Sequence, residues 1–344
     1  MRPQEVIAAT MTGPKHLKLP GHDKVALPMV WLGQSVRTTV VTRRYPEFAR
    51  ESWMVSLGDA VYRPRLIEKV FKADIRARIG VKGPLMLDSG GFTMMMNNRS
   101  LRVDEIASIY RDTQAELCIT LDIPPIGTDT RRKRSGKYCK TRDNLAALID
   151  TVQPRRIVPV VHGTTIEEVD SNCLAIAELL PKPRMVCIGG LVPLLRRSMR
   201  HPEERAASIA WLKTLVSTVR REFPRSVIHI LGAGSPQNVA TAIACGADST
   251  DSLAWRRAAG FGTIYLPGTS ERFLAPRDRQ RENSRRTVSR EDLELLEICL
   301  CPACAEWPSL KHRVAGLSES YLARAAHNAF IVLAEARSAI SKTS

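Results

Sequence analysis

The sequence lacks any apolar run long enough to cross a membrane, and it is poor in acidic residues. No apolar stretch approaches the ~20 residues that span a bilayer. Lys15, Lys18 and Lys24 interrupt the N-terminal segment, which lacks the apolar core of a signal peptide. We therefore expect a cytoplasmic protein with no membrane partner. Its eight cysteines should be reduced thiols that bind metal or pack in the interior.

The charge balance is strongly basic. There are 51 Lys and Arg against 35 Asp and Glu, a net charge of +16. Such an excess favours a polyanionic partner, most simply nucleic acid, although a merely basic solvated surface is the alternative. A content of 44% apolar and 25% charged residues excludes a disordered chain. At ~150 residues per domain, the length indicates two domains or one large barrel with an appendage.

Short apolar runs alternate with amphipathic stretches along most of the chain. The runs are nearly continuous, as is typical of buried parallel strands. Six to eight such repeats over ~250 residues predict a (β/α)8 barrel, with an open doubly wound sheet as the alternative. The predicted strands are 53–57, 85–87, 117–121, 157–161, 185–188 and 227–231, with further ones near 247 and within 25–32. The predicted helices are 64–79, 103–115, 144–152, 166–180, 202–223 and 236–244.

The chain changes character after residue 270. Residues 271–290 are rich in arginine and indicate a linker or a basic surface loop. A cysteine cluster follows, and then a helix expected over about 318–341. We expect a catalytic barrel over 1–270, and a basic linker, metal module and terminal helix over 271–344.

Polar residues fall where the predicted strands end. Asp88 and Asp122 end two strands, His162 and the pair Gly189–Gly190 end two more, and Asp248 with Asp251 follows the last. In a β/α barrel these ends meet at one rim, where active sites are built. Any one aspartate is equally explained as a helix N-cap. Together they predict a nucleophile, a proton donor and acceptor, and a partner for the N–H edge of a base, as glycosidic chemistry on a nucleic acid requires.

A compact cysteine motif predicts a metal site. Cys299, Cys301 and Cys304 have C-x-C-x2-C spacing, and His327 on the following helix supplies a fourth ligand. Such a Cys3His set is closed, which is typical of structural Zn²⁺, whereas the alternative is three packed thiols. The remaining cysteines are expected to pack in the core: 118, 139, 173, 187 and 245.

These motifs, taken in order, resemble the tRNA-guanine transglycosylases, over about residues 80–340. The details resemble the archaeal, archaeosine-type branch more than the bacterial one. The segments that carry the resemblance, besides the metal ligands with His327-Asn328, are Leu87-Asp88-Ser89-Gly90-Gly91-Phe92, Leu121-Asp122-Ile123-Pro124, Val158-Pro159-Val160-Val161-His162-Gly163, Ile188-Gly189-Gly190-Leu191-Val192-Pro193, Leu231-Gly232-Ala233-Gly234-Ser235-Pro236 and Gly246-Ala247-Asp248-Ser249-Thr250-Asp251-Ser252.

The resemblance implies a (β/α)8 barrel with bound zinc that exchanges guanine in a polynucleotide for a 7-deazaguanine. By position, Asp251 is the nucleophile that attacks C1′ and Asp88 is the general acid and base. The implied base pocket comprises Asp122 and Ser89, His162, Gly189, Gly190 and Leu191. The chain departs from the family at Thr93 and His162, where glutamine is usual, which predicts altered base recognition at His162.

The acceptor is predicted from the charge and from a third departure. Archaeal tRNA enzymes carry additional C-terminal RNA-binding domains, and this sequence ends after the metal-site helix. It thereby resembles a branch that inserts 7-cyano-7-deazaguanine into DNA, so we expect a DNA acceptor. The alternatives are a tRNA enzyme of archaeal type without those domains and a non-catalytic nucleic-acid-binding subunit; a generic glycosidase is disfavoured by the charge.

Three basic clusters follow predicted active-site strands and are expected to contact phosphates. The first is expected to be a loop that continues to Lys137, Tyr138, Lys140 and Arg142. Helper proteins of a modification system and a homodimer are also expected partners. The predicted contact residues are Arg131, Arg132, Lys133 and Arg134, then Arg196 and Arg197, and finally Arg256 and Arg257.

Overall fold

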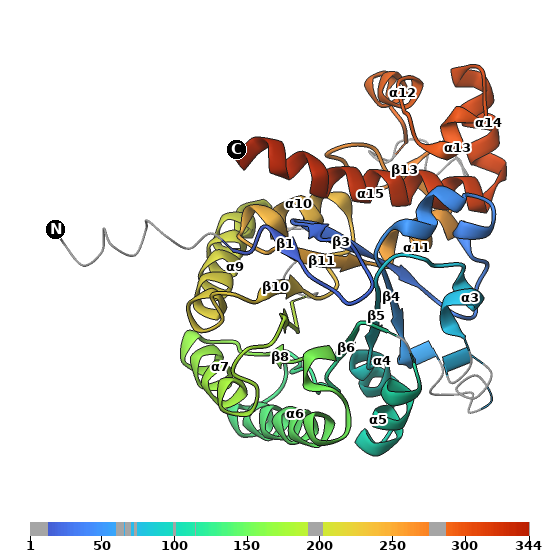
Figure 1. Ribbon diagram of the computed structural model, residues 1–344. Helices are drawn as coiled ribbons and strands as arrows, with labels where there is room; N and C mark the ends of the chain where they lie inside the picture. Colours follow the sequence, from blue (N-terminus) through green and yellow to red (C-terminus); the bar gives the residue numbers. More distant parts are fainter. Residues whose placement is uncertain are drawn as a thin grey trace.

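A ring of parallel strands surrounded by helices forms the body of the molecule (Figure 1). The computed structural model describes residues 13–59, 65, 70–71, 74–98, 101–113, 115–191, 202–274 and 287–343. The strands of the ring are β3 (Met29–Gln34), β4 (Trp53–Ser56), β5 (Leu85–Asp88), β6 (Leu117–Ile119), β7 (Ile157–Val158), β8 (Val160–Val161), β9 (Met185–Ile188), β10 (Val227–Ile230) and β11 (Ser249–Ser252).

The ring closes through one interrupted strand. The hydrogen-bonded order is β7-β6-β5-β4-β3-β11-β10-β9-β8, and every pairing is parallel. The two ends of this order, β7 and β8, are halves of one segment that breaks at Pro159, because proline has no N–H to give to a ladder. The Pro159 carbonyl still accepts from the N–H of Cys187, at 2.8 Å. The nine segments therefore make an eight-membered barrel; the prediction of a (β/α)8 fold is confirmed, and the open sheet is wrong.

The strand alternation fills the barrel with apolar side chains and leaves its C-terminal end polar. Trp31, Met54 and Met86 belong to one buried cluster inside the ring, which Leu17 and Leu19 extend beside the hairpin β1 (His16–Leu17) and β2 (Val25–Ala26). One pleat further along β5 stands Asp88, paired in register with Ser56 of β4. Successive residues on one face of a strand are two apart, so these polar side chains continue the inward-facing row.

Helices cover the outside of the barrel. Helix α10 has the predicted bounds, and α7 and α9 each end one residue early. The predicted helix 64–79 is described only in part: it ends as α3, and most of 60–73 lies outside the described residues. The helices are α3 (Ile75–Ile79), α4 (Gly91–Met96), α5 (Val103–Asp112), α6 (Arg131–Thr151), α7 (Ile166–Leu179), α9 (Pro202–Glu222), α10 (Pro236–Ala244) and α11 (Ala254–Gly260). None of the helices in the described ranges is long and apolar enough to cross a membrane.

Helix α6 corrects the prediction that residues 131–134 begin a loop. The helix starts 13 residues before the predicted 144, and the Thr130 hydroxyl accepts from the Lys133 N–H at its N-cap, at 3.3 Å. Its buried residues are confined to the second half, from Thr141 to Leu148. The first half has no apolar face to produce a helical period, so the sequence pattern could not reveal it.

The C-terminal segment folds onto the barrel. Helix α15 (Tyr321–Thr343) packs on α10, α11 and β3 (Figure 1). Asn328 joins it to the barrel: its side chain accepts from the Tyr265 N–H at 2.7 Å and donates to the carbonyls of Trp255 and Thr263, both at 3.1 Å. The other elements here are β12 (Thr263–Ile264), β13 (Arg272–Phe273), α12 (Arg290–Glu297), α13 (Pro302–Ala305) and α14 (Leu310–Glu319). The helix predicted over about 318–341 is found as α15, which starts three residues later because the extended Ser320 separates it from α14.

Candidate functional site

Three carboxylates converge at the C-terminal end of the barrel. Asp88 is the last residue of β5, Asp251 lies in β11 in register with the inward-facing Trp31, and Asp122 follows β6 by three residues. The charges of Asp122 and Asp251 both act on Asp88. The thiol of Cys187, inside the ring, has its pKa raised by burial and further by all three carboxylates. The structure thus brings together the three aspartates that the sequence grouped at one rim.

Asp88 is the carboxyl group with an unusual proton affinity. Its pKa is raised to about 6: burial is the largest cause, the charges of Asp122 and Asp251 add to it, and hydrogen bonds with Ser56 and the Gly90 backbone act in the opposite direction. A carboxyl group with a pKa near neutrality can both donate and accept a proton under ordinary conditions. The surroundings of Asp88 therefore suit a general acid and base.

Asp251 is buried, and the part of the chain that the structure describes holds it through one oxygen. Its Oδ1 accepts from the Gly232 N–H at 2.7 Å and lies 3.3 Å from Nε2 of His229, whose Nδ1 is 2.6 Å from the Ser249 hydroxyl. None of the hydrogen bonds among the described residues uses Oδ2. An anchored carboxylate with one free oxygen is oriented as a nucleophile must be.

His229 is a site residue that the sequence analysis missed. It is fully buried on β10 and forms hydrogen bonds with both Ser249 and Asp251. The signal was present, since His229 is the polar member of the otherwise apolar run Val227–Ile230. The residues predicted at the rim all end or follow predicted strands, whereas His229 lies within one.

Asp248 lies at the opposite end of the barrel, which corrects the prediction that it shares the rim with Asp251. It comes just before β11, forms an ion pair with Arg220, and accepts from the Ile228 N–H at 2.7 Å near the start of β10. Arg220 also donates to the Ser226 carbonyl at 2.6 Å. Asp248 therefore stabilises the N-terminal end of the barrel and is remote from the other carboxylates.

Asp122 and His162 form a buried pair beside two glycines. Nε2 of His162 is 2.9 Å from Oδ2 of Asp122. A side chain at Gly91 would place its Cβ 2.3 Å from the Asp122 carbonyl oxygen and 2.7 Å from Oδ1, and one at Gly189 would come within 2.5 Å of Cε1 of His162. Only glycine allows this close approach of backbone to the pair.

Two other predicted pocket residues are buried at the same end. The Ser89 hydroxyl donates to the Thr120 carbonyl at 3.2 Å, so its hydrogen is already used inside the protein. Leu191, after β9, is buried in the main apolar core. Both fit a supporting position in the wall of the site.

Some of the residues predicted to contact phosphates are exposed, and others already bind partners within the protein. Arg131, Arg132 and Lys133 are exposed in the first turn of α6, and Arg257 is exposed on α11. Arg134 is instead paired with Glu168 at 2.8 Å. The predicted residues Arg196 and Arg197 lie outside the described residues.

Arg256 is a correction to the predicted phosphate contacts. It is buried, and its guanidinium donates to the Thr38 hydroxyl, to the Thr39 carbonyl at 3.1 Å and to the Tyr321 hydroxyl at 3.2 Å. A buried arginine that joins α11 to α15 and to the segment after β3 cannot reach a phosphate on the surface. It stabilises the packing of α15 instead.

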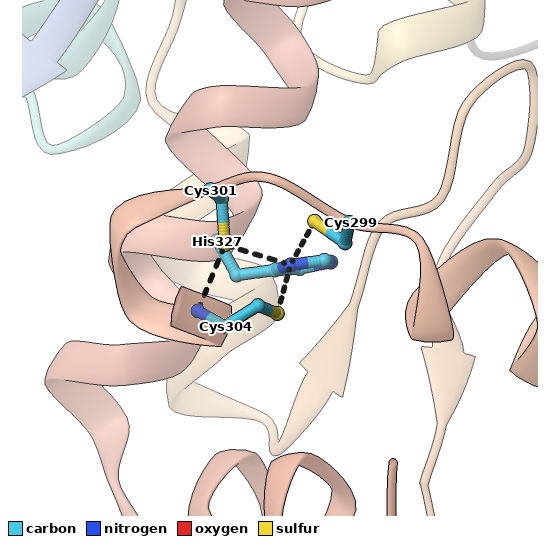
Figure 2. A group of neighbouring side chains, drawn as sticks. All are labelled: Cys299, Cys301, Cys304 and His327. Carbon is cyan, nitrogen blue, oxygen red and sulfur yellow. Dashed lines mark hydrogen bonds between the residues drawn. The ribbon is translucent and has the colours of Figure 1, made fainter. Parts of the chain in front are cut away.

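Cys299, Cys301, Cys304 and His327 meet in one buried group (Figure 2). Nδ1 of His327 lies 3.6, 3.4 and 3.5 Å from the three sulfur atoms in that order. Ligands at the usual Zn–S and Zn–N bond lengths in a tetrahedron stand about 3.6 Å apart. Nε2 of His327 is 2.8 Å from the Tyr265 carbonyl, which places the ring hydrogen on Nε2 and frees Nδ1 for a metal.

The predicted packing of the other cysteines is confirmed for four of them. Cys118, Cys173, Cys187 and Cys245 are buried. Cys139 is exposed on the charged first half of α6, so the prediction of core packing is wrong there.

The family model of the queuine tRNA-ribosyltransferases (TGT) matches residues 60–340. The chain belongs to this family. The matched region includes the three aspartates at the rim and all four metal ligands.

Similar transglycosylases come from archaea. The tRNA-guanine(15) transglycosylase of Methanosarcina mazei is 25% identical over 280 residues, which is 80% of this chain and 51% of that protein. The enzyme of the same name from Haloferax volcanii is 24% identical over 314 residues, 90% of this chain and 55% of that protein. That of Pyrococcus abyssi is 24% identical over 280 residues, 80% of this chain and 43% of that protein. The chain thus spans about half the length of the curated relatives it matches.

Proposed function

We propose that this member of the transglycosylase family exchanges guanine in tRNA for a free 7-deazaguanine, through a covalent bond to Asp251. The observation that carries the proposal is the difference between the carboxylates at the rim. Among the described residues, Asp251 is anchored through Oδ1 alone, Asp88 has a pKa of about 6, and Asp122 is paired with a histidine. Carboxylates whose surroundings differ in this way can serve as nucleophile, proton carrier and base reader in one site.

The first half of the reaction breaks the bond between C1′ and the guanine. Oδ2 of Asp251 attacks C1′ and forms an ester, while protonated Asp88 gives its proton to the departing base. The Gly232 N–H and His229 hold Oδ1 and fix the direction of the attack. The transition state resembles an oxocarbenium ion, which the neighbouring carboxylates stabilise electrostatically.

The second half reverses these events with the incoming base. Asp88, now ionised, removes the proton from the ring nitrogen of the 7-deazaguanine, and that nitrogen attacks C1′ and displaces the Asp251 carboxylate. Asp88 ends protonated and Asp251 ends ionised, so both return to their starting states. No redox step or external energy source is needed, since one glycosidic bond replaces another.

Asp122 is proposed to read the guanine-like edge of both bases. Its Oδ2 is taken by His162, and its Oδ1 lies beside Gly91, whose missing side chain lets the backbone pack against the carboxylate. A carboxylate oxygen accepts from the ring N–H or the amino group of guanine. A base lacking those donors would leave the buried carboxylate unpaired and is rejected for that reason.

The acceptor is proposed to be tRNA, not the DNA expected from the sequence. The similar proteins are named for tRNA and do not support a preference for DNA. Arg131, Arg132 and Lys133 lie in the first turn of α6, and this first turn contains no acidic residue. Positive charge at a helix N-terminus opposes the helix dipole. Their exposure at this unfavourable position supports a contact with phosphates.

Zn²⁺ is the proposed occupant of the cysteine and histidine group. Three sulfur atoms and one imidazole nitrogen at tetrahedral spacing are the donor set that zinc prefers. All four ligands come from the protein, so the site is closed and structural. Bound zinc would join the α13 region to α15, which packs on α11 of the barrel.

Base exchange with labelled substrates tests this proposal. The protein is incubated with labelled 7-cyano-7-deazaguanine or labelled guanine, and with either total tRNA or plasmid DNA, before nucleoside analysis. We expect label in tRNA and none with Asp251→Asn. Label in DNA alone would replace the proposed acceptor, and label in neither polymer would overturn the proposed activity.

A further inference from the structure

The imidazole of His162 is held from a helix outside the barrel. The Tyr138 ring, on α6, stacks on the His162 ring with their centroids 6.3 Å apart and their planes 13° from parallel. His162 is 2% exposed and its Nε2 is 2.9 Å from Asp122. The Asn172 side chain donates to the His162 carbonyl at 2.8 Å and fixes its backbone. Tyr138 therefore contacts the partner of the base-reading carboxylate.

Tyr138 is itself fixed by a carboxylate. Its hydroxyl donates to Oε2 of Glu168 at 3.1 Å. Arg134 donates to Oε1 of Glu168 at 2.8 and 3.1 Å, and the Thr164 N–H and hydroxyl donate to Oε2, both at 2.9 Å. Burial raises the pKa of Glu168, but the hydrogen bonds from Arg134, Thr164 and Tyr138 outweigh it and lower the pKa to about 2. Glu168 thus remains a charged and fully used anchor.

The orientation of the His162 ring decides what Asp122 offers. A carboxylate oxygen accepts hydrogen bonds, so the contact with Oδ2 assigns the ring hydrogen to Nε2 of His162. Nδ1 is buried and has no hydrogen-bond partner among the described residues; a Cβ at Gly189 would lie 3.1 Å from it. Rotation of the ring would break the bond to Oδ2. Nothing bonded to Nδ1 opposes that rotation, so the ring depends on the bond to Oδ2, on the close Gly189 backbone and on the stacked Tyr138 ring.

We propose that Tyr138 is a positioning residue for base recognition, acting through His162. A series of side-chain contacts connects the basic helix α6 to the carboxylate that reads the base. It runs from Arg134 through Glu168, Tyr138 and His162 to Asp122. By fixing the His162 ring, Tyr138 keeps Oδ2 of Asp122 occupied and presents Oδ1, beside Gly91, to the N–H edge of a guanine-like base. This inference rests on the proposed base exchange, and it assigns to α6 a part in selecting the base besides contact with phosphates.

The test compares Tyr138→Leu, which removes the ring, with Tyr138→Phe, which keeps the ring and loses only the bond to Glu168. We expect Tyr138→Leu to raise KM for the incoming base about tenfold with kcat within about twofold, and Tyr138→Phe to raise KM about twofold. Cys139→Ser, at the exposed neighbouring position, should leave both constants unchanged. An unchanged KM in Tyr138→Leu, or an equal fall in kcat with a loss of folded protein, would overturn the positioning role.

A second readout does not depend on activity. In protein labelled with ¹⁵N at histidine, the His162 resonances are assigned by their absence in His162→Gln. We expect the wild-type protein and Tyr138→Phe to show a hydrogen on Nε2 alone, and Tyr138→Leu to show exchange between tautomers. Identical His162 resonances in all three proteins would overturn the inference. If the resonances are as expected but no base exchange occurs, the proposed function is wrong and the positioning of His162 by Tyr138 still holds.

Discussion

His229 and Asp251 lie side by side in the barrel, with Nε2 of the histidine 3.3 Å from Oδ1 of the carboxylate. The Ser249 hydroxyl, 2.6 Å from the other ring nitrogen, sets the direction of the imidazole. This arrangement orients the proposed nucleophile through the oxygen that does not attack.

Replacement of His229 should slow the attack without abolishing it. His229→Leu removes one of two hydrogen bonds to Oδ1, while the Gly232 N–H remains. We expect adduct formation to slow by about 10²-fold, the cost of one lost orienting contact in a preorganised site. Single-turnover measurement of the protein–tRNA adduct checks this. His229→Gln, which keeps a donor, should lose less; equal rates in wild type and His229→Leu would show that the histidine only fills the barrel.

Asp248→Asn separates the two ends of the barrel. Asp248 neutralises the buried Arg220, so its replacement leaves an uncompensated charge and should cost about 3 kcal/mol of stability. The folded fraction should nevertheless form the adduct with tRNA at the wild-type rate. Urea unfolding measures the first effect and single-turnover kinetics the second. Loss of the adduct in fully folded Asp248→Asn would place this residue in the chemistry after all.

The raised pKa of Asp88 gives a pH dependence to stability. The folded protein holds this proton up to a pKa of about 6, above the ordinary value of 3.8, so the unfolded chain loses it first as the pH rises. Wild type should therefore lose stability relative to Asp88→Asn between about pH 4 and pH 6, by up to about 3 kcal/mol. Urea unfolding of both proteins at pH 4, 5, 6 and 7.5 checks the sign. A constant difference over this range would show that burial does not perturb Asp88.

Removal of a metal ligand should lower both zinc content and stability. Cys301→Ser takes one sulfur from a closed four-ligand group, so about one zinc ion per chain should fall to near none. Metal analysis and thermal unfolding of the purified proteins measure the two effects. Cys139→Ser removes an exposed thiol outside the group and serves as the control. Full zinc content in Cys301→Ser would mean that the cluster is packed thiols.

The basic turn of α6 should contribute to the salt dependence of tRNA binding. Arg131, Arg132 and Lys133 replaced together by glutamine should reduce the slope of log Kd against log salt by about two, if most of the three contact phosphates. The matched control is Arg111→Gln, exposed at the end of α5 that leads into the start of β6. An unchanged slope in the triple variant would leave these residues as a solvated basic surface.

The alternation of apolar runs was sufficient to predict the barrel, because buried parallel strands are apolar on both faces. The predicted strand 185–188 and helix 236–244 have the observed bounds. The pattern of apolar runs could not predict how the barrel closes, because closure depends on how Pro159 divides one strand between two neighbours. The division of the chain near residue 270 stays a prediction.

Errors at the site arose where one-dimensional order does not determine direction. Asp248 and Asp251 are three residues apart, yet Asp248 precedes β11 and Asp251 lies near its C-terminal end, so they face opposite ends of the barrel. Arg256 and Arg257 are adjacent, but a helix turns one inward and the other to solvent. The roles of Asp88, Asp122 and Asp251 stay predictions, although the structure brings the three together.

A covalent link between Asp251 and tRNA is the central claim. Wild-type protein is mixed with tRNA without an incoming base, denatured, digested with nuclease and protease, and measured by mass spectrometry. We predict a base-free ribose phosphate joined through C1′ to the peptide that contains Asp251, absent in Asp251→Asn and released from wild type by added 7-deazaguanine. An adduct on any other residue, or base exchange that persists in Asp251→Asn, would contradict this account.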